Sequence, residues 1–518
     1  MKLLYSISLL LIGLSTFIDA YRILGIFPRN SRGDFIAFEQ LMKHLADRGH
    51  EVNVISFFPL ERVHTNYYDI VQLPDGIPSL VNNVTYENIG NKMRYFLNLI
   101  DTEHGNDVCN ILSHSSVQNI IHNPPKDRPY DVVITEVFIA HCFAVFGDVL
   151  KVPVVGVSTY GRLPWVYDIV NNPEGFDFIP EKSIEANHIS FVDRWTNVLS
   201  RAYTKWSFYS RTQSQDAIIK KSVGKNARGI RELEANIALM LTNAHIMTHG
   251  PRAMIPGLVE VGGMHIVDKY IPPLNEWLDE SNDGVIYFNL GTDFIVDSFP
   301  AETIDAFYKS FRKLAPMRVL MRVEKLAKLP QGLPENVLTT PWIQQLRVLA
   351  HPNVKAFITH GGIMGLQEAI YAAVPIIGIP LWGDQFDNVD GFVKKNIGVK
   401  LDFDSITEKT LDEAFNHILN NSTVRESASA FSLAFFDRPV KPIDMACYSI
   451  EYVIRHGSGV LKVPPAQLAW WQYFNLDVYV ILIVVSLIMT ISIFKILRAI
   501  TVKIISRFRR KPKFHKLL

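Results

Sequence analysis

Residues 354–385 read VKAFITHGGIMGLQEAIYAAVPIIGIPLWGDQ and change pattern three times. The apolar run VKAFIT has the length of a buried strand, and it ends at a His-Gly-Gly turn. The stretch IMGLQEAIYAA then has helical spacing, and a second apolar run, VPIIGIP, follows it. The order strand, glycine turn, helix, strand is typical of a parallel α/β sheet.

Comparable apolar runs, rich in Val and Ile, recur along the chain. They are continuous rather than alternating, as in parallel strands that are buried on both faces. The runs are RILGIF, EVNVISFF, YDVVITEVF and VPVVGVS in the first half, and GVIYFNLG, MRVLMRVE and NVLTTPW in the second. Because 518 residues exceed one usual core, we predict an α/β protein with two Rossmann-like domains that face each other across a cleft.

A stretch rich in Gly and Pro separates the two series. It covers residues 241–263 (LTNAHIMTHGPRAMIPGLVEVGG) and is predicted to be a linker. The predicted first domain is therefore 21–240, and the second is 264–475 and includes C-terminal helices. Ligands of such sheets bind beyond the carboxyl ends of the strands, which here border the cleft.

Both ends of the chain have the composition of membrane signals. Residues 1–20 fit a cleaved secretory signal peptide, although a buried strand or helix is an alternative. Residues 478–494 carry no charge, so we predict a transmembrane helix over 476–494, with aromatic residues at its front edge. The tail 495–518 has nine Lys or Arg and no acid, so the positive-inside rule predicts a cytosolic tail and a type I, single-pass protein.

The rest of the chain has the features of an exported enzyme body. Without the tail it has 43 basic and 51 acidic residues, a net charge of −8, which argues against nucleic acid as the main partner. Glycosylation triplets begin at Asn83, Asn420 and Asn421, although such triplets also occur by chance. Three cysteines allow at most one disulfide. Lys516, third from the end, is weakly indicative of retention in the endoplasmic reticulum.

The glycine turn predicts a phosphate site. A strand that ends at His360-Gly361-Gly362 and continues into a helix presents free backbone N–H groups and a positive helix end to an anion. Glu368 follows two turns later and can accept two neighbouring hydroxyls, as in a ribose. Trp342 offers a flat face on which a base can stack.

This 342–385 region resembles the UDP-glycosyltransferases, in particular their animal membrane-bound branch, whose pattern is FITHGG followed by QEA, VP, GIP and GDQ. The resemblance extends over nearly the whole chain, including the linker, signal peptide, terminal span and basic tail. It implies the GT-B fold, UDP-sugar as co-substrate, no cofactor, a small lipophilic acceptor and a role in detoxification. The sequence contains no HExxH or CxxC pattern, so nothing in it predicts a metal site. Whether the protein forms a homo-oligomer is left open.

The resemblance also implies roles for individual residues. Trp342 would stack on uracil, Gln345 and Glu368 would bind the ribose, His360 with Gly361 and Gly362 would bind the diphosphate, and Asp384 and Gln385 would bind the sugar. Gly291 and Thr292 would form a second phosphate-side loop.

The family's catalytic base is a His in the loop after the first strand, but this chain has Asp34 there, in Gly33-Asp34-Phe35. A carboxylate of ordinary pKa is a weak base for an alcohol. Glu136 and His141 follow the strand from which relatives supply an acid. One hypothesis is an exchanged pair in which His141 is the base and Asp34 its partner; the alternative is a structural His beside a solvated Asp.

Three functions remain open at this level. The first is an inverting hexosyltransferase of the endoplasmic reticulum membrane that uses UDP-glucose, because IMGLQEA follows the FITHGG motif in place of an Asn-Gly form. The second is a catalytically impaired lumenal protein that binds UDP-sugar. The third, a nucleotide-sugar epimerase or a phosphorylase, fits a single-span anchor poorly.

Overall fold

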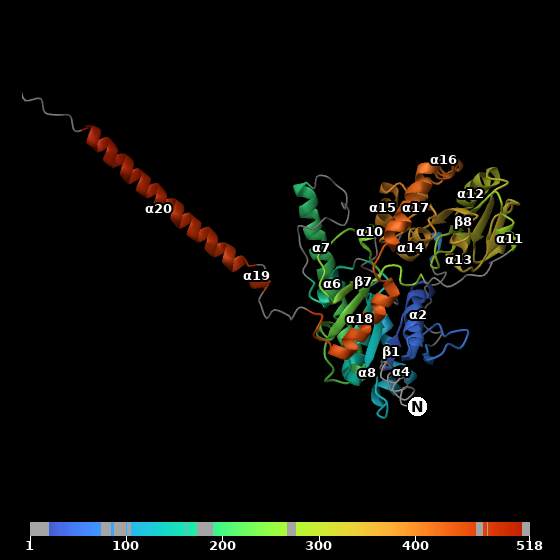
Figure 1. The fold of residues 1–518 in the computed structure, drawn as a ribbon, viewed down its shortest axis with the longest axis horizontal. Helices are drawn as coiled ribbons and strands as arrows, with labels where there is room; N and C mark the ends of the chain where they lie inside the picture. The colour runs from blue at the N-terminus through green and yellow to red at the C-terminus, as the bar shows by residue number, and fades with distance from the viewer. Residues whose placement is uncertain are drawn as a thin grey trace, which may run out of the picture. The chain divides into compact units, whose positions relative to one another are not determined.

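The structure is a computed structural model that describes residues 20–73, 84–87, 100, 105–161, 163–172, 190–266, 276–462, 470–473 and 475–509. It contains a compact body up to Val463 and a separate unit from Pro464 to Leu518. The body holds two parallel sheets, each with its own helices (Figure 1). The predicted two-domain α/β fold is therefore confirmed.

The first sheet has the strand order β3-β2-β1-β4-β5-β6-β7, and all its pairings are parallel. Its direction of winding reverses between β1 and β4, so a crevice opens at the carboxyl ends of these two strands. The strands are β1 (Arg22–Ile26), β2 (Glu51–Ser56), β3 (Tyr67–Gln72), β4 (Val132–Glu136), β5 (Val154–Ser158), β6 (Ile237–Thr242) and β7 (Leu258–Glu260).

The second sheet has the order β10-β9-β8-β11-β12-β13 and is also parallel throughout. Its winding reverses between β8 and β11, the strand of the FITHGG motif. The strands are β8 (Val285–Asn289), β9 (Arg318–Arg322), β10 (Val337–Thr340), β11 (Val354–Thr359), β12 (Ile376–Gly378) and β13 (Gly398–Lys400).

Helices follow most of the strands and cover the sheets. In the first domain they are α2 (Arg32–Asp47), α4 (Ser115–His122), α5 (Val145–Leu150), α6 (Pro164–Ile169), α7 (Phe191–Thr212), α8 (Gln215–Val223), α9 (Ile230–Ala235) and α10 (Ile246–His249). After them come α11 (Glu276–Asp279), α12 (Ala301–Lys313), α13 (Gln345–Leu349), α14 (Ile363–Tyr371), α15 (Gln385–Lys394), α16 (Glu408–Asn420), α17 (Ser422–Phe436) and α18 (Pro442–His456). Short 3₁₀ turns are η2 (Asn106–Ser113), η3 (Cys142–Ala144), η4 (Val296–Ser298), η5 (Leu326–Lys328) and η6 (Phe403–Ser405).

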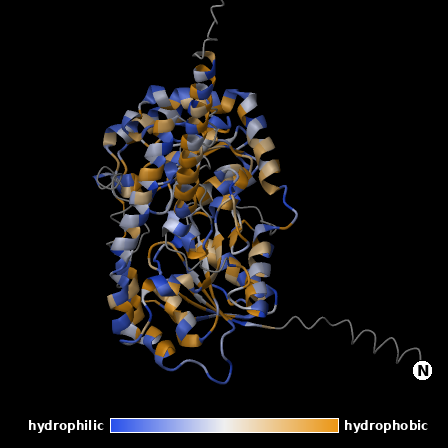
Figure 2. Cartoon of the chain, turned by 90° about the vertical axis from the view of Figure 1, so that its left-hand side faces the viewer, coloured by the Kyte–Doolittle hydropathy of each residue, from blue (hydrophilic) through white to orange (hydrophobic). Residues whose placement is uncertain are grey.

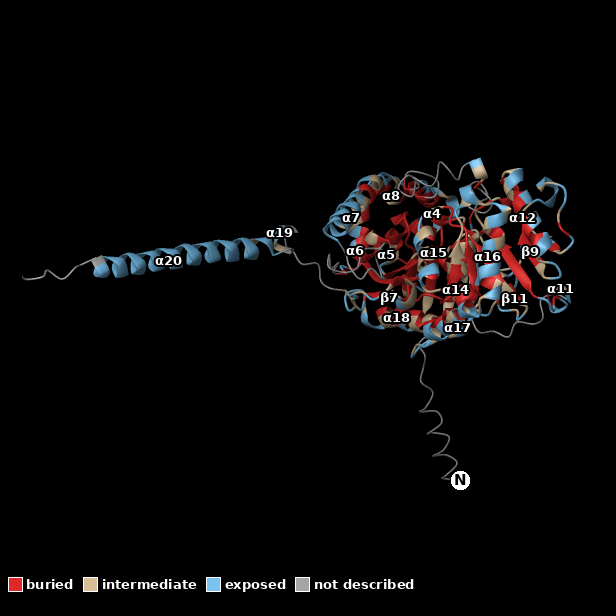
Figure 3. Cartoon of the chain, turned by 90° about the horizontal axis from the view of Figure 1, so that it is seen from above, coloured by how far each residue is buried: buried red, intermediate tan, exposed pale blue. Residues whose placement is uncertain are grey.

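Burial explains the continuous apolar runs in the sequence. The central strands β4, β5, β8 and β11 are buried almost throughout, whereas the helices have exposed outer faces (Figure 3). The helices accordingly carry both polar and apolar residues along their length (Figure 2). In α12, for example, Ile304, Phe307 and Phe311 recur at helical spacing and are buried against β8 and its neighbours.

Two predicted domain boundaries need correction. The predicted linker 241–263 contains β7, which pairs with β6 and forms the edge of the first sheet. The helix α18, which was assigned to the second domain, packs against α2 and β6 of the first. Its apolar face, which includes Ala446 and Ile450, belongs to the same core cluster as β1 and α2. Ion pairs between α2 and α18, such as Arg48 with Glu451, reinforce this contact.

One disulfide forms, and it joins Cys109 in η2 to Cys142 in η3 with their Cα atoms 6.0 Å apart. Cys447 is a buried free thiol. The three cysteines thus give the single bridge that their number allows, which is compatible with an oxidising compartment.

The C-terminal unit contains α19 (Trp470–Tyr473) and the 34-residue helix α20 (Leu476–Arg509). Residues 476–508 are long and apolar enough to cross a membrane. The helix continues past the predicted end at residue 494 because the basic residues that follow also favour a helix. The predicted signal peptide, except for Ala20, and Asn83 lie outside the described residues, as does the chain after residue 509.

Candidate active site

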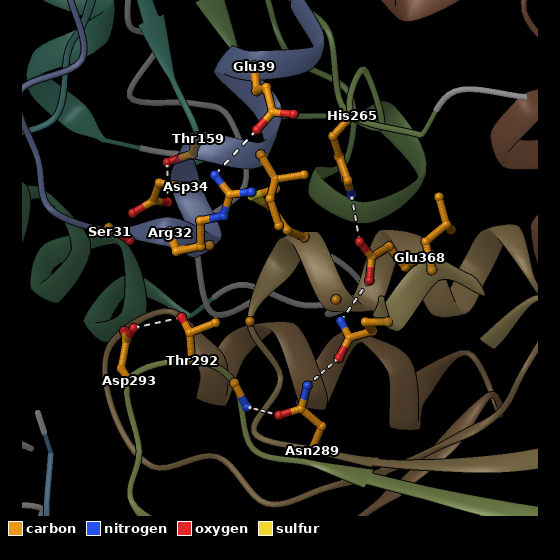
Figure 4. A pocket seen from close by; sticks show the side chains of 18 of the residues that line it. Ser31, Arg32, Asp34, Glu39, Thr159, His265, Asn289, Thr292, Asp293 and Glu368 are labelled. Atoms are coloured by element: carbon orange, nitrogen blue, oxygen red, sulfur yellow. Dashed lines mark hydrogen bonds and ion pairs between the residues drawn. The ribbon is translucent and has the colours of Figure 1, made fainter. Parts of the chain in front are cut away.

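A cavity of about 670 Å³ lies where the loops after the carboxyl ends of both sheets meet. From the first domain, it is lined by the loop after β1, with Asp34, and by Thr159 and Tyr160 after β5. From the second, it is lined by loops after β8, β10, β11 and β12 (Figure 4). The predicted donor-site residues that line it are Gly291, Thr292, Trp342, Gln345, His360, Gly362, Glu368, Asp384 and Gln385.

The glycine turn after β11 has the geometry of an anion site. Gly361 has a φ of +88°, a conformation that favours glycine, and Gly362 is the N-cap of α14. A Cβ atom on Gly362 would lie 2.5 Å from His360 Nε2, so the imidazole needs this glycine for space. The turn thus leaves the backbone at the start of α14 open toward the cavity.

His360 lies between two glycine turns. On its other side, a Cβ atom on Gly291 would come within 2.6 Å of the ring. Burial, together with the charge of Arg322, lowers the pKa of His360 to about 4. Its Nδ1 atom has no hydrogen-bond partner among the described residues. The imidazole is therefore neutral near pH 7 and can bind a phosphate oxygen only through an N–H group.

A chain of hydrogen bonds orients the predicted ribose carboxylate. Gln345 Nε2 donates to Glu368 Oε2 at 2.7 Å, and Asn289 Nδ2 donates to Gln345 Oε1 at 2.7 Å (Figure 4). Burial raises the pKa of Glu368 to about 7, against the smaller opposing effect of the bond from Gln345. Glu368 is therefore a carboxylate whose charge is poorly solvated in the free protein.

His265 also contacts this carboxylate and was missed by the sequence analysis. Its Nε2 atom lies 3.6 Å from Glu368 Oε1, and burial lowers its pKa to about 4 (Figure 4). His265 follows Gly262 and Gly263 at the end of the predicted linker. The Gly-rich sequence around it predicted a linker and gave no sign that His265 would line the cavity.

The remaining predicted donor residues line the same cavity. Trp342 follows β10 and is 46% exposed, so a face of its ring remains available for stacking. Asp384 is the N-cap of α15, and desolvation of its carboxyl group raises its pKa to about 6 although the residue as a whole is exposed. Gln385 Oε1 accepts the backbone N–H groups of Leu381 and Trp382 at 2.9 and 3.0 Å, so its oxygen fixes the turn.

Asp34 lies in the first turn of α2 and lines the cavity, but both of its oxygens already have partners. Thr159 Oγ1 donates to Asp34 Oδ1 at 2.7 Å, and Arg29 Nη1 lies 3.1 Å from Asp34 Oδ2. The same Arg29 nitrogen donates to Glu136 Oε1 at 2.8 Å. A single buried guanidinium therefore bridges the two carboxylates.

The hypothesis that His141 and Asp34 form a catalytic pair is wrong. His141 is buried, does not line the cavity, and its Nδ1 atom bonds to Glu234 Oε1 at 2.6 Å. Its ring packs against Phe208, next to the disulfide. Since this His belongs to the core of the first domain, the structural alternative describes it, and Arg29 is the partner of Asp34.

Glu136 is buried behind this bridge and is not among the residues that line the cavity. Burial raises its pKa to about 7, while Arg29 opposes the shift and Asp34 adds to it. Arg29 precedes the predicted catalytic loop, and a lone Arg in a polar loop gave no sign that it would be buried.

The segment of the first domain that carries Asp34 lies close to the loop after β8 of the second domain. A Cβ atom on Gly33 would lie 3.1 Å from Thr292 Oγ1. Asp34 is also close enough to raise the pKa of Asp293, which burial raises to about 6. Asp34, at the position of the family's catalytic His, therefore lies beside the loop that was predicted to contact the diphosphate. Across the described residues, no group of three or more His, Cys, Asp or Glu could bind a metal ion.

Comparisons with known proteins agree with this architecture. Residues 26–511 match the family described as "UDP-glucoronosyl and UDP-glucosyl transferase". The chain is 33% identical to UDP-glucosyltransferase 2 of Dactylopius coccus, covering 89% of this chain and 90% of the relative. It is 32% identical to a UDP-glucuronosyltransferase of Pleuronectes platessa, over 71% of this chain and 80% of the relative.

The fold also resembles a solved structure, the glycotransferase of kitacinnamycin, with a TM-score of 0.55 and 17% identity over 84% of this chain and 99% of that one. At this identity the likeness concerns the fold alone, and it supports the GT-B arrangement of two Rossmann-like domains. The match over nearly the entire sequence shows that the chain belongs to the UDP-glycosyltransferase family.

Proposed function

We propose that this glycosyltransferase moves glucose from UDP-glucose to a hydroxyl group of a small lipophilic acceptor. The observation that carries the proposal is the single cavity in which Trp342, His360 and Glu368 lie together, with Asp34 on the opposite wall. The first three would bind uracil, diphosphate and ribose. Asp34 would face the acceptor.

The sugar end of the cavity favours a neutral hexose over a uronic acid. Asp384, the predicted sugar ligand, lies within electrostatic range of Asp34, and so does Asp293. A uronate carboxylate would bring a further negative charge into this acidic region. A neutral glucose would instead donate its hydroxyl groups to the carboxylates.

In the proposed reaction, Asp34 takes the proton of the acceptor hydroxyl while the acceptor oxygen attacks the anomeric carbon. The bond from that carbon to the diphosphate breaks, and the configuration inverts. His360 and the N-terminus of α14 would stabilise the charge that develops on the departing UDP. Arg29, which Asp34 shares with Glu136, would orient the Asp34 carboxylate in this step.

The second candidate is a protein that binds UDP-sugar but transfers it poorly. One observation favours it: both oxygens of Asp34 are engaged, by Thr159 and Arg29, in the position where relatives have the catalytic His. An ion-paired carboxylate is a weaker base than an imidazole near neutral pH.

The two candidates differ in turnover but not in UDP binding. The experiment measures UDP binding and sugar transfer for the full chain in detergent. Binding is measured as the thermal protection that UDP gives, and transfer as the consumption of UDP-glucose in the presence of small phenols and alcohols. We expect transfer in the wild type, a loss of roughly 10²–10⁴-fold in Asp34→Asn, and retained transfer in Asp34→His. UDP protection should be the same in all three.

Full activity of Asp34→Asn would show that another group is the base. Protection by UDP without transfer in the wild type, followed by transfer in Asp34→His, would establish the second candidate. Competition among UDP-glucose, UDP-glucuronate and UDP-galactose tests the identity of the sugar, and tighter binding of UDP-glucuronate would refute glucose.

We further propose that the body faces the lumen of the endoplasmic reticulum as a signal-directed, type I glycoprotein anchored by α20. The Cys109–Cys142 disulfide and the exposed or half-exposed sequons at Asn420 and Asn421 support this side of the membrane. A role in detoxification follows if the acceptors are foreign lipophilic compounds. Protection of the body from added protease in sealed microsomes is the test, and cleavage without detergent would refute it.

A further inference from the structure

The helix α7 is amphipathic, but its apolar face points away from the body of the protein instead of toward the core. Only its last two turns contact the body closely: Ser207, Phe208 and Thr212 are buried, and Phe208 stacks on Trp165 at 4.0 Å. The earlier turns are mostly exposed, as Figure 3 shows for most of the helix. Its start is nonetheless fixed by a capping box between Ser190 and Asp193.

The exposed part of α7 carries a stripe of large apolar side chains. Residues four apart in a helix share a face, and so do residues separated by about two turns. The stripe residues, each more than half exposed, are Phe191, Val192, Trp195, Leu199, Tyr203 and Trp206. An ordinary surface helix turns such a stripe toward the core. In α7 the buried Phe208 and Thr212 lie outside the stripe, so the apolar face is turned away from the body.

The polar side of α7 is basic. The helix contains four basic residues and one acidic residue, and the basic ones are Arg194, Arg201, Lys205 and Arg211. Trp and Tyr on the apolar face with Lys and Arg on the other are the composition of helices that lie in a membrane surface. A continuous exposed apolar surface of this kind marks an interaction site.

We propose that α7 is a second membrane contact, which lies in the plane of the bilayer with its apolar stripe at the boundary between headgroups and acyl chains. A bilayer is the partner that the chain itself provides, because α20 is long and apolar enough to span one. That tether keeps the body at a high local concentration near the lipid surface, so even a modest affinity of α7 for lipid would suffice. The aromatic side chains of the stripe complement the headgroup region of a bilayer.

The experiment asks whether the body stays on the membrane once α20 no longer tethers it. The full chain, with a specific protease site inserted between residues 463 and 470, is reconstituted in vesicles of phosphatidylcholine with a minor fraction of phosphatidylserine. After cleavage, flotation separates bound from free body. We expect the wild-type body to float with the vesicles, and the double variant Trp195→Glu with Trp206→Glu to show at least about a tenfold lower bound-to-free ratio.

A matched control distinguishes the stripe from general surface hydrophobicity. Leu433, on α17, is 76% exposed and lies outside the stripe, so Leu433→Glu should float like the wild type. None of these three residues lines the cavity, so thermal protection by UDP checks that each variant is folded.

Three results would overturn the proposal. The wild-type body could leave the vesicles on cleavage, or the double variant could stay bound as tightly as the wild type. In the third, the wild-type body would remain a dimer after the vesicles are dissolved in detergent while the double variant is a monomer, which would identify a second copy of the chain as the partner of α7.

Discussion

The replacement Glu368→Gln should make the free protein more stable and its complex with UDP weaker. Burial raises the pKa of Glu368 from 4.5 to about 7, so the folded protein binds this proton more tightly than the unfolded chain does. The contribution to stability is present below about pH 4.5 and is lost as the pH rises through 7. Above pH 7, the ionised carboxylate costs the wild type about 3 kcal/mol, a penalty that a neutral amide does not carry.

Thermal unfolding of the full chain between pH 5 and 8.5, with and without UDP, measures this effect. At the upper end of the range and without UDP, Glu368→Gln should unfold a few degrees above the wild type, and the difference should shrink toward pH 5. The amide can still accept the hydrogen bond from Gln345, so packing is conserved. Saturating UDP should raise the midpoint of the wild type more than that of the variant, because the charged acceptor of the ribose hydroxyls is missing.

The matched control is Glu451→Gln. Glu451 is also buried, which raises its pKa, but the bonds from Arg48 and His50 outweigh burial and the net pKa is lowered. A lowered pKa stabilises the folded state above the ordinary pKa of Glu, so Glu451→Gln should lower the midpoint at pH 8. If Glu368→Gln also lowers the midpoint at pH 8 without UDP, or if UDP protects both proteins equally, the assignment of Glu368 as a strained ligand-binding carboxylate is refuted.

Three further outcomes can be measured on the same protein. Gly362→Ala should weaken the affinity for UDP, measured by calorimetric titration, about tenfold or more, because its Cβ atom would displace His360. The control is Gly391→Ala in α15, where a Cβ atom meets nothing within 4 Å, and its affinity for UDP should be unchanged. Trp342→Ala should lower UDP affinity by about 1–3 kcal/mol, with partial recovery in the Phe variant, and equal affinity in all three proteins would exclude stacking. Replacing both Asn420 and Asn421 by Gln should reduce the mobility shift caused by peptide-N-glycosidase, and an unchanged shift would place the glycan elsewhere.

The sequence predicted the fold well where burial on both faces leaves a continuous apolar run. Central strands such as β8 and β11 are buried on both faces and are therefore continuous apolar runs. The edge strand β3, YYDIVQ, contains four residues that favour strands but is mostly exposed, so it gives no continuous apolar run of the kind that marks the central strands. The packing of α18 against the first domain could not be predicted from the sequence either. An amphipathic pattern shows that a helix buries one face but not which domain that face contacts.

The donor side of the candidate site was predicted more fully than the catalytic side. Glycines at a strand end and a carboxylate two turns into the next helix are local patterns, and the strand order brings them together. The Arg29 bridge depends instead on packing between segments more than a hundred residues apart, from β1 to β4. The hypothesis of the His141 pair failed because the loop after β4 carries His141 into the core of the first domain, against Glu234 and Phe208, whereas Asp34 lies in the first turn of α2 beside the cavity.

The ionisable groups of the donor cavity share one electrostatic feature. Burial raises the pKa values of Glu368, Asp384 and Asp293 and lowers that of His360, so each group is biased toward its neutral form. A cavity of this kind would oppose a negative diphosphate less than one with fully charged carboxylates, and the N–H groups at the start of α14 would still be available to the phosphate. If a nucleotide sugar binds as proposed, the carboxylates gain hydroxyl donors and the cost of their ionisation falls. The free protein therefore carries a local instability that ligand binding relieves, which is the expected cost of a preorganised site.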